Sequence, residues 1–477
     1  MTSPSPNAAA SVAVNASSNA PRSLDEIAAA LAGYDPQALT ADGVNAFLAE
    51  LVQPVQGTEV LPLFQALGRV LAHDIVSPIS VPPHDNSAMD GFAFDGGQLQ
   101  PGQPLTLRVV GTALAGKAWT GTVAAGECVK IMTGAIMPAG LDTVVPQEFT
   151  TAEPQTADNA TGPRIRIAPD VLRAGDNRRF KGEDLMEGRV ALARGECLTP
   201  AALGLVASLG LPQVTVTRTL RVAYFSTGDE ILSLGEAPRE GAVYDSNRYT
   251  VFGLLTRMGI EVIDLGSVRD DPALLEATFR HAASQADAII TSGGVSVGEA
   301  DHTRTMMKKL GDVAFWRIAM RPGRPMAVGR IPPEKMEEKM ASSAYVESAS
   351  SSQINSNHVP GAILFGLPGN PVAVMVTFLA FVRPALLRMM GCTRPPLPLL
   401  RAVSAEPMRK KPGRTEYQRG IVSTGPGGQL TVRTTGNQGS GVLSSMVQAN
   451  GLIVLHHGQG NVAVGDAVDV MMFDGVI

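Results

Sequence analysis

The pattern of hydrophobic and polar positions changes several times along the chain. Near the start, Ser23 and Glu26 resemble a capping box that opens a helix at Leu24–Leu31. Further helices are predicted in three places, which are residues 42–51, 63–71 and 201–209. Between residues 75 and 184, short β-like runs alternate with glycine and proline, which predicts a separate all-β domain.

Residues 220–390 have a different pattern, in which continuous apolar runs are followed by polar turns and helical segments. The expected strands are 220–225, 261–265, 286–291, 314–319, 326–328 and 362–365, and the expected helices are 247–258, 271–283, 303–310 and 371–389. Strands without alternation are buried on both faces, so this region predicts parallel strands with helices on both sides, a doubly wound α/β domain. Residues 401–477 alternate as short strands and turns, which predicts a small β-barrel or sandwich.

The expected fold is therefore multidomain, α/β plus β. A doubly wound α/β domain carries an inserted β-domain, a small N-terminal α/β domain and a C-terminal β-barrel-like domain. The expected boundaries are 1–21 for a disordered tail, 22–76 with 188–218 for a discontinuous N-terminal linker or helical domain, 77–187 for the β-domain, 219–395 for the α/β domain and 396–477 for the C-terminal β-domain. Residues 332–360 are serine-rich and interrupt two expected core strands, so they are predicted to be a disordered insertion.

Composition narrows the class of protein. The 477 residues include 39 Lys and Arg against 44 Asp and Glu, a net charge of −5 that argues against a nucleic-acid or anionic-membrane partner. The cysteines are Cys128, Cys197 and Cys392; their wide spacing suits neither a zinc site nor a disulfide framework and favours a reducing compartment. The longest apolar run, Pro371–Val382, is interrupted by Arg383 and is too short to span a bilayer. Since residues 1–21 also lack a secretory signal, we expect a cytoplasmic protein.

The turns that follow the α/β strands are the first candidates for a ligand site, because ligands bind beyond the carboxyl ends of such strands. These turns are rich in glycine and small polar residues, and the candidates are Ser226, Thr227, Gly228, Ser292, Gly293, Gly294, Ser296, Gly298, Pro368, Gly369, Asn370 and Pro371. Glycine lets the backbone approach a ligand, and free N–H groups near a helix start can bind phosphate.

Acidic residues in the same turns predict a metal ion beside the phosphate. Mg²⁺ prefers hard oxygen ligands, so Asp229, Glu230, Asp270 and Asp301 are candidate ligands. The alternative for Asp229 and for Asp271 is that they cap a helix.

A basic cluster lies nearby in the sequence, around Pro322-Gly323. Arg317, Arg321 and Arg324 present several fork-shaped donors, which suit phosphate or an oxyanion such as molybdate or sulfate. In the β-domain, Asp90 precedes a glycine and on its own would be taken as a turn residue.

Taken together, the motifs resemble those of the MoeA family, molybdopterin molybdenumtransferases related to the E domain of gephyrin. The segments that carry the resemblance are DNSAMDG at 85–91, IMTG at 131–134, STGDE at 226–230, SGGVSVGEAD at 292–301 and GLPGNP at 366–371. They occur in one order between about residue 24 and the C-terminus, with the segment 332–360 left out.

This resemblance implies an elongated four-domain subunit, a homodimer, and an α/β domain of the molybdopterin-binding type. It implies insertion of molybdate into the dithiolene of adenylylated molybdopterin, with release of AMP and help from Mg²⁺. The implied catalytic residues are Asp90, Thr133, Asp184, Glu230, Asp270 and Asp301, of which Glu230, Asp270 and Asp301 would hold the metal. The turn residues above and the three arginines would contact the substrates, and Asp90 and Thr133 would close the site of the partner subunit.

The sequence differs from the family pattern in two respects, and two other functions are possible. Some family members have lysines at the positions of Arg317, Arg321 and Arg324, and a common tyrosine is Phe92 here. The implied partners are a molybdopterin adenylyltransferase and molybdoenzymes or other cofactor acceptors. An adenylyltransferase with the same Ser-Gly-Gly domain is one alternative, although the additional β-domains argue against it. A scaffold that clusters partners, as gephyrin does, is the other, although the complete acidic set favours catalysis.

Overall fold

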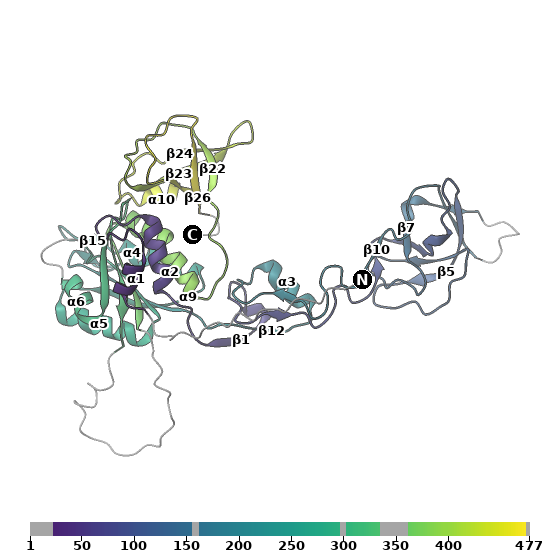
Figure 1. Ribbon diagram of the computed structural model, residues 1–477, viewed down its shortest axis with the longest axis horizontal. Coiled ribbons are helices and arrows are strands. Elements are labelled where there is room, and N and C mark those ends of the chain that lie inside the picture. Colours follow the sequence, from purple (N-terminus) through teal and green to yellow (C-terminus); the bar gives the residue numbers. More distant parts are fainter. Residues whose placement is uncertain (1–21, 155–161, 296–301, 334–360, 474–477) are drawn as a thin grey trace, which may run out of the picture. The chain divides into compact units, whose positions relative to one another are not determined.

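The computed structural model describes residues 22–154, 162–295, 302–333 and 361–473 (Figure 1). Contacts divide the chain into two compact units, which we describe separately: unit 1 is Met1–Thr58 with Thr217–Ile477, and unit 2 is Glu59–Val216. The predicted tail at 1–21 and residues 334–360 of the predicted insertion lie outside the described residues. The domain boundaries expected from the sequence stay a prediction.

A six-stranded mixed sheet forms the centre of unit 1. Its strand order is β16 (Glu261–Val268), β13 (Arg221–Thr227), β17 (Ala288–Ser292), β21 (Ala362–Leu367), β20 (Pro325–Ile331) and β18 (Asp312–Arg317). The first four strands are parallel, but β20 and β18 run antiparallel to their neighbours, so an all-parallel sheet was the wrong prediction for this edge. Residues 318–324 alone separate β18 from β20, and a connection this short joins antiparallel strands rather than parallel ones.

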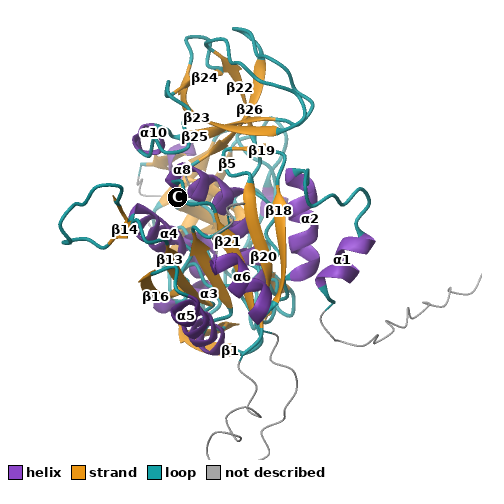
Figure 2. Cartoon of the chain, turned by 90° about the vertical axis from the view of Figure 1, so that its left-hand side faces the viewer, coloured by secondary structure: helices purple, strands orange, loops and turns teal. Residues whose placement is uncertain are grey.

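Helices cover both faces of this sheet, which confirms the doubly wound prediction (Figure 2). The crossover through α4 (Ser246–Arg257) leads from β13 to β16, and the crossover through α5 (Pro272–Gln285) leads back from β16 to β17. Because both crossovers are right-handed and run in opposite directions along the sheet, α4 and α5 lie on opposite faces. On the α5 face, Phe225 and Phe279 pack edge to face with their ring centroids 5.1 Å apart.

A long buried helix follows β21. It runs from α8 (Pro371–Thr377) through a π-helical turn, η5 (Phe378–Val382), into α9 (Arg383–Met389). Arg383 therefore does not end it, and the prediction that this apolar run is too short to span a bilayer was wrong. Among the described residues it is the one helix long and apolar enough for a membrane span, but 78 % of its apolar window is buried in the protein. Such burial is typical of a core helix; α2 (Ala41–Leu51) packs beside it, and α1 (Leu24–Ala30) packs against α2 and β18.

The start of α1 matches its sequence signature, because the Ser23 side chain accepts from the N–H of Glu26 and the Glu26 side chain accepts from the N–H of Ser23. The third predicted helix, at residues 63–71, is wrong. A single 3₁₀ turn, η1 (Leu63–Gln65), forms there, and Gly68 follows with a φ of 77°. That left-handed conformation does not continue a helix.

Unit 2 contains the predicted all-β domain and a smaller region around α3 (Pro200–Ser208). In the smaller region, β1 (Thr58–Pro62) pairs with β12 (Gln213–Thr217), and β2 (Ile75–Val76) pairs with β11 (Val190–Leu192). The sheet of the β-domain has the strand order β7 (Thr143–Pro146), β4 (Gly91–Phe94), β6 (Glu127–Ile131), β5 (Leu105–Ala113), β9 (Arg164–Ile167) and β8 (Thr150–Glu153). Two short strands, β3 (Asn86–Ser87) and β10 (Arg178–Arg179), pair beside it.

The C-terminal region of unit 1 is a closed five-stranded barrel, which decides between the barrel and the sandwich. Its strands are β23 (Thr415–Thr424), β24 (Leu430–Thr434), β22 (Leu400–Ser404), β26 (Ala467–Met472) and β25 (Gly451–Leu455), and β25 pairs back to β23. A short strand from the α/β region, β19 (Met320–Arg321), pairs with β23 in parallel. The barrel is thus joined to the turn that contains the predicted arginine cluster.

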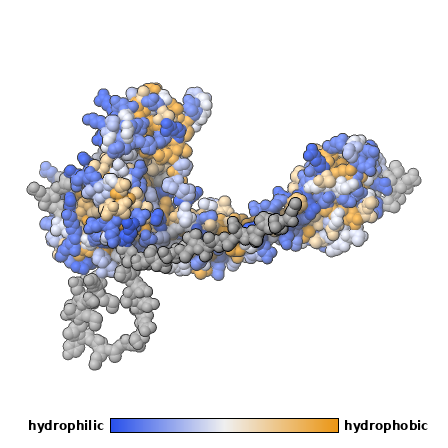
Figure 3. All heavy atoms as spheres, in the orientation of Figure 1, coloured by the Kyte–Doolittle hydropathy of each residue, from blue (hydrophilic) through white to orange (hydrophobic). Residues whose placement is uncertain are grey.

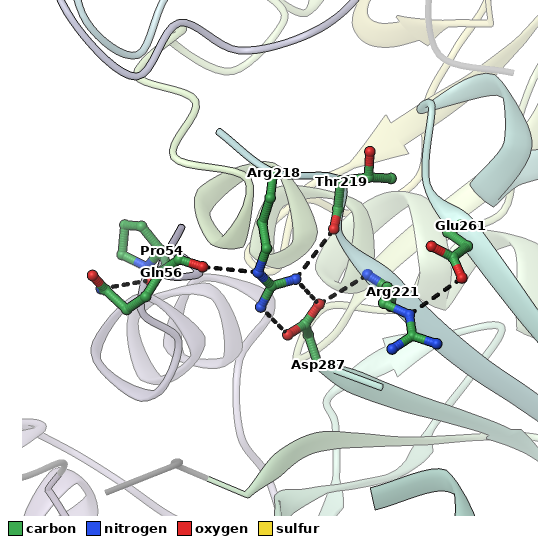
Figure 4. Close-up of polar contacts among 7 residues, drawn as sticks. All are labelled: Pro54, Gln56, Arg218, Thr219, Arg221, Glu261 and Asp287. Atoms are coloured by element: carbon green, nitrogen blue, oxygen red, sulfur yellow. Dashed lines mark hydrogen bonds and ion pairs between the residues drawn. The ribbon is translucent and has the colours of Figure 1, made fainter. Parts of the chain in front are cut away.

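A polar cluster closes the amino-terminal end of the central sheet (Figure 4). The Arg218 guanidinium donates to both carboxylate oxygens of Asp287, over 2.8 and 2.6 Å, and to the carbonyl oxygen of Gln56. Asp287 also accepts from the N–H of Arg221 over 2.9 Å. Arg218 therefore connects the segments at Gln56 and Arg218, which lie next to the two unit boundaries in the sequence, with the α/β sheet.

Candidate functional site

The carboxyl ends of three parallel strands bring the predicted turns together. Ser226 at the end of β13 is in register with Ser292 at the end of β17, and Ser292 is in register with Leu367 at the end of β21. The turns at 226–230, 292–295 and 367–371 therefore start side by side. Ser296, Gly298 and Asp301, which were also predicted here, lie outside the described residues.

A buried hydroxyl network joins two of these turns. The Tyr224 hydroxyl lies 2.9 Å from the Ser226 hydroxyl and 2.7 Å from the Ser292 hydroxyl, and all three residues are buried. Burial, followed by the charge of Asp245, raises the pKa of Tyr224, so the phenol stays protonated. Tyr224 was not predicted, because a tyrosine inside an apolar strand gives no sign of polar neighbours.

A second network connects the acidic residues with threonines. The Thr303 hydroxyl, on α6 (His302–Leu310), donates to Asp270 over 3.2 Å and lies 3.1 Å from the Thr227 hydroxyl. The N–H of Asp270 in turn donates to Asp229 over 3.3 Å. The structure thus brings Thr227, Asp229 and Asp270 together, and it adds Thr303, which the sequence did not single out.

Two glycines at this edge have a positive φ, and one of them is closely approached by the backbone of a neighbouring strand. Gly293 has a φ of +92°, and a Cβ there would lie 2.4 Å from the Thr227 carbonyl oxygen. Gly228 has a φ of +145°, and a Cβ there would lie 2.5 Å from a Glu230 carboxylate oxygen. The Glu230 carboxylate therefore lies over the first turn, next to the strand end.

The carboxylates at this edge have the chemistry of a magnesium site with few protein ligands. In the described ranges, Glu230 and Asp270 form no ion pair with a lysine or arginine, so their charge is open to a cation. No group of three or more His, Cys, Asp or Glu side chains with metal-site geometry occurs among the described residues. Mg²⁺ commonly takes one or two carboxylates and completes its shell with water and phosphate oxygens, so Glu230 and Asp270 fit it.

The neighbouring acid, Asp271, has the structural role that was considered for it. Its carboxylate accepts from the N–H groups of Ala273 and Leu274, each over 2.9 Å, and so caps α5. Asp229 caps no helix in the described chain, because the turn after it leads to the short strand β14 (Ile231–Leu232).

The fourth turn leads directly into α8. Asn370 is the N-cap of this helix but its side chain makes no capping bond, and Pro371 takes the first helical position. The carbonyl oxygen of Gly369 accepts from the Asn247 side chain over 2.7 Å, whereas Pro368 is buried. The Asn370 side chain is exposed, and the N–H of Val372 in the first turn of α8 donates to the carbonyl oxygen of Ser440.

The predicted arginines separate in the structure. Arg321 lines a cavity of about 240 Å³ beside the barrel, together with Arg409, Arg419 and Gln438. The carboxylates of Glu406 and Glu416 also line this cavity; Glu416 forms an ion pair with Arg414, and Glu406 accepts from the N–H and the hydroxyl of Thr434. Arg317 and Arg324 are exposed and do not line this cavity.

Arg419 is the residue of this cavity that the sequence did not reveal. It is 1 % exposed, and its guanidinium donates to the Ser445 hydroxyl and to the carbonyl oxygens of Asn437 and Gly439 over 2.9 to 3.2 Å. In the part of the chain that the structure describes, it has no carboxylate within ion-pair distance. Burial, and then the charge of Arg321, lower the pKa of Arg419 to about 10. A buried cation without a counter-ion that lines a cavity is suited to an anion.

In unit 2, two predicted residues contact each other. Asp90 accepts from the N–H and the hydroxyl of Thr133 over 2.7 and 2.8 Å, and these bonds lower the pKa of the carboxyl. Asp184 is exposed and forms no side-chain bond to either of them in the described chain. In the same unit, Arg178 forms an ion pair with Asp85, so the charge of this arginine is already neutralised by a carboxylate.

The chain is similar to known proteins along almost its whole length. Three family models match: "MoeA N-terminal region (domain I and II)" at residues 39–210, "Probable molybdopterin binding domain" at 223–388 and "MoeA C-terminal region (domain IV)" at 401–473. A molybdopterin molybdenumtransferase of Haemophilus influenzae is 40 % identical over 433 residues, which cover 90 % of this chain and 97 % of that protein. A protein of the same name from Nostoc is 33 % identical, covering 92 % and 94 %. A crystal structure of the molybdopterin biosynthesis MoeA protein of Pyrococcus horikoshii matches with a TM-score of 0.71 and 25 % identity, over 91 % of this chain and 100 % of that one.

Proposed function

The chain belongs to the MoeA family, and from that premise we propose that it is a molybdopterin molybdenumtransferase of molybdenum cofactor biosynthesis. It inserts molybdate into adenylylated molybdopterin, releases AMP and depends on Mg²⁺. The relatives named above support the transferase activity. The observation that carries the proposal is the convergence of Ser226, Ser292, Thr227 and Asp270 at one sheet edge, where hydroxyls, glycine backbone and free carboxylates suit a nucleotide with its metal.

In this proposal the α/β edge binds the diphosphate of the substrate. Backbone N–H groups of the turns that contain Gly228 and Gly293 donate to the phosphate oxygens. Glu230, Asp270 and Asp301 would hold Mg²⁺. The ion would supply positive charge beside the phosphates of the substrate.

The second substrate, molybdate, is proposed to bind at the barrel cavity. Arg321 and Arg419 supply positive charge there, and the guanidinium of Arg419 is already held in place by neutral acceptors. A preorganised fork of donors suits a tetrahedral oxyanion. Arg317 and Arg324 would then contribute long-range attraction rather than direct contact.

We also propose a homodimer. Apolar side chains of unit 2 are exposed around β1 and η1, and Phe64 is completely exposed. Hydrophobic surface gathers over this part of unit 2 (Figure 3). A second copy of the chain would cover Val60, Phe64 and Leu67, since surfaces of this kind mark interfaces. Light scattering should then report about twice 49.8 kDa at micromolar concentration, and an active monomer would exclude the dimer.

The remaining expectations stay within the same proposal. Asp90, Thr133 and Asp184 take part in the reaction, as the family resemblance implies. The protein works in the cytoplasm, receives its substrate from a molybdopterin adenylyltransferase and passes the product to molybdoenzymes or other cofactor acceptors.

The function is tested by AMP release from adenylylated molybdopterin by the purified protein. We expect release that requires both molybdate and Mg²⁺ and stops on addition of a chelator. A folded protein that releases no AMP, or releases it equally without molybdate, would contradict the transferase function. Formation rather than cleavage of the adenylylated substrate from ATP would instead favour the adenylyltransferase alternative.

A further inference from the structure

Two polar residues are buried at the start of α4, where hydropathy alone would leave them in solvent. Asp245 is 4 % exposed and Asn247 is 8 % exposed, whereas Tyr244, which precedes them, is 44 % exposed. Asp245 is the N-cap of α4, and one of its oxygens, Oδ1, accepts from the N–H of Arg248 over 3.0 Å. Capping gives a hydrogen bond to one carboxylate oxygen of Asp245, but it does not explain why both Asp245 and Asn247 are buried.

The other acceptor atoms of this pair have no partner. Asp245 Oδ2 and Asn247 Oδ1 are buried and accept no hydrogen bond from any described residue. The contrast within the same sheet is Asp287, whose carboxylate accepts three bonds, from Arg218 and Arg221. A buried carboxylate oxygen without a donor is unfavourable, so its retention points to a donor that arrives with a ligand.

Both residues lie at the proposed substrate edge. The Asn247 side chain donates to the carbonyl oxygen of Gly369, in the turn between β21 and α8. The charge of Asp245 acts on the Tyr224 hydroxyl, which bonds to Ser226 and Ser292 at the ends of β13 and β17. The unpartnered acceptors therefore belong to the same strand ends as the glycine turns.

We propose that Asp245 Oδ2 and Asn247 Oδ1 accept hydrogen bonds from the aminopyrimidinone edge of the substrate's pterin ring, an inference that rests on the proposed function. This edge presents two adjacent donors, a ring N–H and an amino group, which match two acceptors. The edge of adenine alternates a donor with an acceptor and would leave one of the two protein oxygens unsatisfied. The carboxylate makes one of the bonds charge-assisted, which strengthens it.

A metal ion is the competing occupant, since carboxylate and carboxamide oxygens also bind Mg²⁺. The pair supplies one charge only, and the free carboxylates Glu230 and Asp270 offer a more strongly charged donor set at the same edge. The donor edge of the pterin is therefore the better match, and metal binding is one outcome of the test.

The test compares two probes on the full-length protein, 6-hydroxymethylpterin by fluorescence titration and AMP by calorimetry. Asp245→Asn keeps the helix cap, because asparagine caps as well as aspartate, and it removes the anionic acceptor. We expect the affinity for the pterin to fall about 10- to 100-fold and the affinity for AMP to stay unchanged. If Asp245→Asn fails to fold, Asn247→Ser removes the second acceptor instead and should weaken the pterin in the same way.

The matched control is Asp264→Asn. Asp264 forms an ion pair with Arg248 of the same helix and also acts on Tyr224, but its side chain is partly exposed and fully bonded. The control should leave both affinities unchanged.

Three outcomes would overturn the inference. The first is a wild-type affinity of Asp245→Asn for the pterin. The second is an equal loss of pterin affinity in the control variant. The third is that Asp245→Asn loses affinity only for AMP, or only for Mn²⁺ used in place of Mg²⁺. Failure of the inference is distinguishable from failure of the function, because AMP release by the wild-type protein is measured separately. A wild-type protein that releases AMP but binds no pterin overturns only the inference.

Discussion

Replacing Arg419 by methionine should abolish most oxyanion binding without unfolding the protein. Methionine fills a similar volume but removes the charge and the donors that face the barrel cavity. A buried side chain that is bonded on three sides is ordinarily important for stability. Arg419 should behave differently because no carboxylate of the described barrel lies within ion-pair distance of it.

The magnitude follows from the lowered pKa of this arginine. A change from 12.5 to about 10 means that the folded protein disfavours the charged form by about 3 kcal/mol. Three hydrogen bonds to neutral acceptors oppose this loss, at about 1 kcal/mol each. The two contributions nearly cancel, so Arg419→Met should change the free energy of unfolding by less than about 2 kcal/mol.

The sign of the pH effect is part of the same prediction. Because the pKa of Arg419 is lower in the folded protein than in the unfolded chain, its charge destabilises the fold at every pH below about 10. This destabilisation is relieved only as the pH rises through 10. The free energy of unfolding of Arg419→Met, relative to that of wild type, should therefore be at least as high at pH 7 as at pH 10. A bound anion should stabilise the wild-type protein at pH 7, where the arginine is charged.

The assay is the shift of melting temperature and the calorimetric affinity with molybdate. Wild type should be stabilised by molybdate, and Arg419→Met should bind it about 10- to 100-fold more weakly, the equivalent of one charge-assisted hydrogen bond. Arg401→Met is the control, since Arg401 lies on the same barrel but is exposed and paired with Asp469. Equal molybdate binding by Arg419→Met and wild type would refute the anion role, and a loss of stability above about 4 kcal/mol would refute the cancellation.

Three further predictions concern other parts of the chain. Arg218→Met leaves Asp287 without its bidentate partner and should lower the free energy of unfolding, measured by chemical denaturation, by about 2 kcal/mol. Removing the exposed ion pair between Arg221 and Glu261 should lower it by less than about 0.5 kcal/mol. Equal losses of stability would show that the ion pair of Arg218 with Asp287 contributes no more than an exposed one. Replacing 334–360 by a short turn should leave melting temperature and AMP release near wild type, because β20 and β21 are antiparallel neighbours in register up to that segment; a large loss of either would contradict this. Asp301→Asn should lower molybdate-dependent AMP release about 10²-fold at an unchanged melting temperature, and an equal rate would leave it a helix cap.

Local sequence determined much of the fold of this protein. The capping box at Ser23, the proline at the start of α8 and the uninterrupted apolar runs of β13, β17 and β21 act over a few residues, so they could be interpreted without neighbours. The polar glycine turns after these strands were found for the same reason. The order of their motifs also indicated the family, which the comparisons confirmed.

Two errors came from patterns that local sequence leaves ambiguous. Residues 63–71 have apolar spacing that suits a helix, but Leu71 instead pairs with Val216 and Val70 with Cys197, across most of unit 2. The direction of β18 and β20 depends on the connection between them, because apolar runs look alike in parallel and antiparallel buried strands.

The site shows most clearly what only the tertiary structure decided. Arg419 resembles any polar residue of a half-exposed strand, and Asp245 resembles an ordinary helix cap. Burial of Arg419 depends on Ser445 and on the turn at 437–439. Asp245 acts on Tyr224, whose hydroxyl bonds to Ser292 at the end of another strand, far from Asp245 in the sequence. Whether a charged group lacks a counter-ion is a property of everything packed around it. That property arises only when distant segments meet, which is why it carries the chemistry and leaves no local sequence signal.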